Sequence, residues 1–173
     1  MISNHFDKKS MTDQGLSELV RLLKSFDKFS SYTGGRIKKG VGSIDVEDEQ
    51  LAVPFCFVLP ADEDESTSPS KNSNIKMSYA IVIGFEIHEP VLKDDDMTIL
   101  SVVDAVKGYL YSNQNLRLGG VGQVVTQAIS GFKVVSYDSI QFDSGDVLGI
   151  CPIIVEYRIS VKTTSRDPSI SLT

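Results

Sequence analysis

Residues 79–87 read YAIVIGFEI and residues 153–161 read IIVEYRISV, and these two stretches decide the fold. The first is apolar on both faces from Ala80 to Ile83, which is typical of a central strand covered on both sides. In the second, Val155 and Tyr157 alternate with polar residues, which predicts a strand with one buried and one solvated face. Together they predict the centre of a sheet.

Two segments with helical periodicity flank the first of these strands. Residues 12–28 place apolar side chains at spacings of three and four, and Thr12 offers a side-chain cap. Residues 98–112 repeat this pattern after three aspartates, which favour the positive end of a helix. The apolar faces of the two expected helices are Leu16, Leu19, Val20, Leu23 and Phe26, and Ile99, Val102, Val103, Val106 and Leu110.

Further strands are expected on either side of the second helix. Residues 51–59 form an apolar run before the strand at 79–87. Residues 122–129, 132–142 and 147–163 are strand-like and are separated by Ser-Gly and Asp-Ser-Gly-Asp breaks, which predicts an antiparallel meander. The expected fold class is therefore α+β: a mostly antiparallel sheet with two helices packed on it and a C-terminal three-stranded meander.

The 173 residues fit a single domain, which we expect at 11–162. Residues 1–10 are polar and aperiodic and predict a flexible arm, and residues 163–173 predict a loose tail. Within the domain, residues 30–44 are rich in glycine and residues 61–74 are polar and serine-rich. Both are expected to be mobile loops.

The composition argues against several classes of protein. A formal net charge of −6 disfavours a sequence-reading nucleic-acid binder, although a like-charged channel could let DNA pass without holding it. The apolar runs are too short to span a bilayer, and residues 1–10 lack the centre of a signal peptide. We therefore expect synthesis in the cytosol and no membrane partner.

Catalytic, cofactor and metal motifs are not evident. Gly35 to Gly40 has the glycine spacing of a phosphate-binding loop, but Val41 stands where the lysine should be. The pair Glu86 and His88 could hold a divalent ion only loosely, and a solvated strand end is the better interpretation. The two cysteines lie in apolar strands and are expected to be buried and unpaired: Cys56 and Cys151. We expect no cofactor and no enzyme.

One positively charged cluster stands out in this acidic chain. Arg36, Lys38 and Lys39 lie among glycines, which let the backbone approach a partner closely. A solvated loop is the simpler explanation, and a contact with the acidic segment of a neighbouring copy is the functional one. The residues of that acidic segment are Asp45, Glu47, Asp48 and Glu49.

The order of these elements resembles the tail terminator, or tail completion, proteins of long-tailed bacteriophages. The resemblance lies in the helix at 16–26, the strands at 51–59 and 79–87, the helix at 98–112 and the closing strand at 153–161. It covers most of the chain and involves no signature residue, so no binding residue is carried over.

The resemblance implies a virion protein, made in the host cytoplasm, at the head-proximal end of the tail. It implies a homohexameric ring that caps the tail tube and meets head-completion or neck proteins, and the sheath in contractile phages. Two alternatives remain open. One is another neck or baseplate component, and the other is a small-molecule enzyme or ligand-binding domain, which a deep polar pocket would favour.

Overall fold

The computed structural model describes residues 11–40, 53–67, 72–86, 99–118, 124–141 and 147–162, with the backbone alone at 62–67, 72–73 and 147. The expected N-terminal arm, the C-terminal tail and the acidic segment at 45–49 lie outside these residues. The elements in chain order are α1 (Met11–Ser25), α2 (Asp27–Tyr32), β1 (Ile37–Lys39), β2 (Phe55–Thr67), β3 (Asn72–Glu86), α3 (Ile99–Ser112), β4 (Val124–Val134), β5 (Asp138–Gln141) and β6 (Val147–Lys162).

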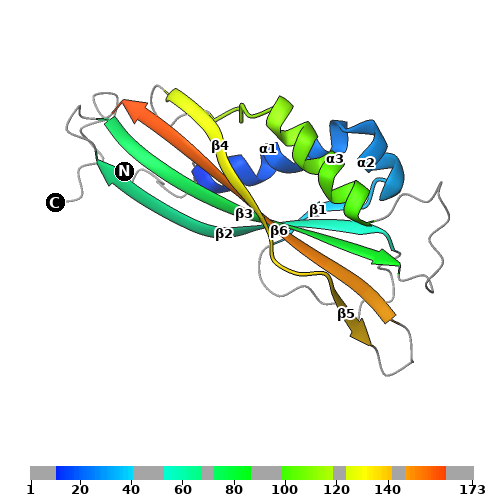
Figure 1. Ribbon diagram of the computed structural model, residues 1–173. Helices are drawn as coiled ribbons and strands as arrows, with labels where there is room; N and C mark the ends of the chain where they lie inside the picture. The colour runs from blue at the N-terminus through cyan, green and yellow to red at the C-terminus, as the bar shows by residue number, and fades with distance from the viewer. Residues whose placement is uncertain are drawn as a thin grey trace, which may run out of the picture.

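The strands form one twisted sheet in the order β1-β2-β3-β6-β4, with β5 also paired to β6 (Figure 1). Only the β1–β2 pair is parallel, and the other pairings are antiparallel. The α+β prediction and the mostly antiparallel sheet are therefore confirmed. Residues 79–86 of the first stretch lie in β3 and the second stretch lies in β6, and these two strands pair along nearly their whole lengths at the centre of the sheet.

One face of the sheet carries the core. Odd-numbered residues of β3 and β6, such as Ile81, Val155 and Tyr157, are completely buried in one cluster with apolar residues of all three helices. Even-numbered residues of the same strands point to the opposite face, where Ala80 and Ile154 are half-buried. In the described part of the chain, helices cover only the first face, whereas the sequence predicted cover on both.

The first expected helix is broken in two. Phe26 takes an extended backbone conformation, with φ −82° and ψ 96°, so α1 ends at Ser25 and α2 begins at Asp27. The Phe26 ring stacks on Tyr109 of α3, with centroids 4.4 Å apart and planes 3° from parallel. The break directs this ring to α3, and the sequence periodicity, which Phe26 fits, gave no sign of it.

The packing of α1 against β3 requires a glycine at position 15. A Cβ atom at this position would collide with the Tyr79 hydroxyl, which donates a hydrogen bond to the Thr12 carbonyl at 3.0 Å. The low helix propensity of glycine is therefore accepted in exchange for close contact between α1 and β3.

The mobile loop expected at 30–44 contains regular structure as far as residue 40. Gly34 and Gly35 have positive φ values of 58° and 75°, which form the turn from α2 into β1. Ile37 is then buried, because β1 pairs in parallel with Cys56–Val58 of β2. One apolar side chain in a glycine-rich segment was too weak a signal to predict this strand.

The loop expected at 61–74 is mostly strand, and this prediction was wrong for its described residues. β2 continues to Thr67 and β3 begins at Asn72, and the two remain paired over this stretch. The polar sequence forms strands because the far side of β3 pairs with the last seven residues of β6. Pairing of the backbone does not depend on apolar side chains.

The C-terminal strands do not form a meander in the order expected. β4 and β5 follow one another along the same edge of β6, which is 16 residues long and can pair with both. The expected break at Ser130 and Gly131 lies inside β4, where the register shifts without a turn.

Candidate assembly surface

The first edge of the sheet is formed by β1 and the outer side of β2, and we call it the β1/β2 edge. The part of this edge at β1 carries the three predicted basic residues, and the structure gives them different contacts. Arg36 donates from Nε to the Pro54 carbonyl at 3.0 Å, and Lys39 forms an ion pair with Asp13 of α1. Lys38 is exposed. Two of the three cations therefore support the fold, and Lys38 is left as the candidate contact.

The other part of the β1/β2 edge, at residues 62–67 of β2, is acidic in sequence. From Asp62 to Thr67, β2 pairs with β3 on one side and has no strand on the other within the described residues. The sequence places four acidic residues in succession on this strand: Asp62, Glu63, Asp64 and Glu65. An unpaired strand edge is a template for another chain, and its charge restricts which chain can join it.

The opposite edge is formed by β4 and β5, and we call it the β4/β5 edge. All four residues of β5 are exposed, and they include Asp138 and the 37% exposed Ile140. Val135 and Tyr137, which precede β5, are about half exposed at 51% and 46%. This part of the edge therefore combines one carboxylate with a row of apolar side chains, a composition suited to a protein contact.

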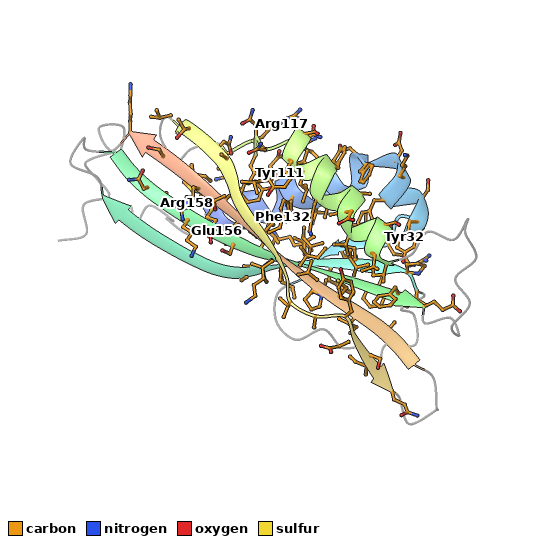
Figure 2. The ribbon with its side chains drawn as sticks, viewed as in Figure 1. Tyr32, Tyr111, Arg117, Phe132, Glu156 and Arg158 are labelled. Atoms are coloured by element: carbon orange, nitrogen blue, oxygen red, sulfur yellow. The ribbon has the colours of Figure 1, made fainter. Side chains whose placement is uncertain are left out.

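Residues 114–117 connect the β4 part of the β4/β5 edge to the helices. Gln127 of β4 accepts from the Leu116 N–H at 3.0 Å and donates to its carbonyl at 2.9 Å. The next residue, Arg117, donates its backbone N–H to Glu18 of α1 at 3.1 Å while its side chain remains exposed. Figure 2 shows Arg117 close to the start of β4, above Tyr111 and Phe132.

Glu18 bonds to both α1 and the 114–117 segment. It also accepts two hydrogen bonds from Arg21, at 3.0 and 3.1 Å. Burial raises the pKa of Glu18, but the hydrogen bonds from Arg21 and Arg117 outweigh it and hold the pKa below its usual value. The charged Glu18 therefore links α1 to the segment that leads into β4.

The helix-free face is apolar at the end of the sheet near β1 and β5, and charged at the end near the start of β4. Glu156 accepts from Ser130 at 2.6 Å and forms ion pairs with Lys76 at 3.1 Å and Arg158 at 3.4 Å. Figure 2 shows Glu156 and Arg158 side by side on β6. The Ser130 hydrogen bond, followed by the two cations, lowers the pKa of Glu156. A carboxylate held in this way is ionised at neutral pH and is not a general acid.

A hollow of about 400 Å³ lies beside this charged cluster. The two cations that line it, Lys76 and Arg158, already contact Glu156. The lining residues are Asn74, Ile75, Lys76, Thr126, Arg158, Ile159 and Ser160. It is therefore an unsuitable site for small-molecule chemistry.

The described residues contain no group of three or more His, Cys, Asp or Glu side chains able to hold a metal ion. Both cysteines are free and buried, as predicted, and burial raises the pKa of Cys151 to about 11. No helix among the described residues is long and apolar enough to cross a membrane.

Sequence reasoning missed Asp138, Arg117 and the acidic strand at 62–65 as surface candidates. Isolated charges have no sequence signal, and the acidic run has the composition of a polar loop. The predicted acidic partners lie outside the described residues: Asp45, Glu47, Asp48 and Glu49.

No family model matches the chain, and no curated protein matches it. Twenty-seven solved chains match, among them one from the structure titled "Virion of native gene transfer agent (GTA) particle". The match is 11% identical, covers 88% of this chain and 99% of that chain, and has a TM-score of 0.47. A likeness at this level identifies neither a family nor a function.

Proposed function

We propose that this chain is a structural protein of a phage-like virion, and that it is the tail terminator. In this role, copies of the chain form a ring that caps the tail tube and joins it to head-completion or neck proteins. The ring is a homohexamer at the head-proximal end of the tail. DNA passes through it without sequence-specific binding.

The observation that carries this proposal is that, among the described residues, the sheet has two different edges with no further strand beside them. A two-fold dimer uses one surface twice, whereas a ring requires two different surfaces that complement each other on each copy. The β1/β2 edge and the β4/β5 edge lie at opposite edges of the sheet (Figure 1), and their sequences differ in charge. The order of the sequence elements, which resembles that of the tail terminators, is a second and independent support.

The surface chemistry agrees with an assembly role. Residues with ionisable side chains in the described region are engaged in ion pairs, exposed to solvent or buried as neutral groups. An enzyme needs a nucleophile or base held in a dry site beside a substrate pocket, and the hollow at Asn74–Lys76 lacks one.

Electron microscopy of negatively stained samples tests the proposal. Purified protein is imaged alone and after mixing with tail tubes of the same phage. The expected result is a sixfold ring, free in solution or bound at one end of the tubes. A protein that remains monomeric and leaves the tubes bare would overturn the proposal, and rings on the opposite end would favour a baseplate component.

The basic cluster needs a more selective test than reversal of all three charges. Arg36 and Lys39 make contacts within the chain, so changing them also disturbs the packing of β1. Lys38 is exposed and can be changed alone. Its acidic partner in the neighbouring copy remains a proposal.

A further inference from the structure

We infer that neighbouring copies join head to tail, with the β1/β2 edge of one copy beside the β4/β5 edge of the next. The inference rests on the proposed ring and specifies which surfaces form it. Lys38 then faces Asp138 of the next copy, and the acidic strand at 62–65 faces Arg117. Three features carry it: the lack of a further strand at either edge in the described part of the chain, the pattern of charge along the edges, and the positions of the charges along the strands.

The strand register places Lys38 and Asp138 at nearly the same height on the sheet. Lys38 is level with Phe57, and through it with Val82 and Pro152. Asp138 is level with Ile150, two residues along the same strand as Pro152. The two charges are therefore offset by about 7 Å along the strands, which the long lysine side chain can span.

A second row of the sheet connects Glu65 with the segment that carries Arg117. Glu65 is level with Ile75, which pairs with Ile159, which in turn pairs with Gln127. Gln127 holds the backbone of Leu116, the residue before Arg117. Each edge therefore carries residues of opposite charge at two positions along the strands. The β1/β2 edge has Lys38 at the first position and the acidic strand at the second, whereas the β4/β5 edge has Asp138 at the first and Arg117 at the second.

This pattern matches when one copy is placed beside the next in the same orientation. At the level of Lys38 a cation meets a carboxylate, and at the level of Glu65 the strand that is acidic in sequence lies beside the segment that carries Arg117. The pattern also permits a two-fold contact, in which Lys38 meets the acidic strand of another β1/β2 edge. The two arrangements differ in whether Asp138 participates, and this difference can be measured.

Charge reversal distinguishes the arrangements. In a head-to-tail contact, Lys38→Glu and Asp138→Lys should each weaken association about fivefold per contact, and the double variant should regain most of it. Lys24→Glu, an exposed lysine of α1, makes the same change of charge away from both edges and should have no effect. Association is measured by sedimentation velocity at low and high salt, since salt weakens exposed charge pairs.

Chemical crosslinking gives an independent test. The two native cysteines are buried, so the introduced thiols are the reactive ones in a double variant that carries Lys38→Cys and Asp138→Cys. The single variants serve as controls. Lys38 and Asp138 lie four strand spacings apart in one chain, about 19 Å, so a short bis-maleimide reagent links these positions only between copies.

The expected result is a ladder of crosslinked species up to the closed ring for the double variant, and no ladder for either single variant. A two-fold contact would give no ladder with any of these variants, because Lys38 then meets the acidic strand at 62–65 of the other copy; association that responds to Lys38→Glu but not to Asp138→Lys would show that contact and overturn the inference. Rings that form normally but give no ladder and ignore both charge reversals would overturn the inference and leave the proposed function standing. A chain that forms no oligomer, alone or on tail tubes, would overturn both.

Discussion

Replacing Tyr157 with phenylalanine should stabilise the protein, although the side chain is completely buried at the centre of β6. Its hydroxyl has no hydrogen-bond partner among the described residues, and burial raises its pKa, so it is a neutral polar group enclosed in the core. An unsatisfied buried polar group costs about 1 to 3 kcal/mol. We expect Tyr157→Phe to raise the free energy of unfolding by about 1 kcal/mol. This is the lower end of the range, because neighbouring side chains do not fully fill the space that the hydroxyl leaves.

Tyr79 provides the matched control. It is equally buried and packs edge to face against Tyr157, with ring centroids 6.2 Å apart. Its hydroxyl, however, donates to the Thr12 carbonyl at 3.0 Å. Tyr79→Phe removes this hydrogen bond between β3 and α1 and should lower the free energy of unfolding by about 1 kcal/mol. The same chemical change in the same core should therefore have opposite signs at the two positions.

Urea unfolding followed by circular dichroism measures the difference. The two variants should differ by about 2 kcal/mol, or about 1 M in the urea midpoint for a slope near 2 kcal/mol/M. Equal slopes would show that the compactness of the two end states is unchanged. If Tyr157→Phe destabilised the protein as much as Tyr79→Phe, the Tyr157 hydroxyl would have to be satisfied in the native state, and the reasoning would fail.

Three other predictions follow from the packing and the charges. Gly15→Ala should destabilise the protein, and it should cost less in a Tyr79→Phe background because the colliding hydroxyl is gone; a double-mutant cycle of urea midpoints measures the coupling. The pKa of Glu156 is lowered in the folded state, so its contribution to stability is present above about pH 4.3 and is lost as the pH falls through the folded pKa. Ser130→Ala removes the largest cause of that shift and should flatten the acid limb of stability against pH. Both buried cysteines should resist a thiol reagent in the native protein and react fully in urea, which a colorimetric thiol assay would detect.

The centre of the sheet could be predicted from sequence because its signals are local and strong. The alternation that begins at Val155 and Tyr157 continues to Val161, and burial of such side chains contributes about 1.5 to 3 kcal/mol each. The helix at Ile99–Ser112 was placed almost to the residue for the same reason. In each case, the periodicity of apolar residues matches the face that is buried.

The edges could not be predicted in this way. β1 has one buried side chain, Ile37, and the ends of β2 and β3 are polar, so their strand structure comes from backbone pairing with distant residues. The break at Phe26 depends on a ring in α3, far away in sequence. The candidate contact between Lys38 and Asp138 is weaker still as a sequence signal, since only the register of the complete sheet brings the two to one height.

The separation between the buried face of the sheet and its exposed edges implies that stability and association between copies can change independently. The helix-covered face holds the fully buried side chains, and removing one of them creates a cavity that costs about 2 to 5 kcal/mol. Lys38 and Asp138 are exposed and are not members of this core cluster, so exchanging their charges should leave the free energy of unfolding nearly unchanged. If either charge reversal lowered the urea midpoint as far as Tyr79→Phe does, the edges would be part of the folding core, and a loss of association could no longer be attributed to the contact between copies.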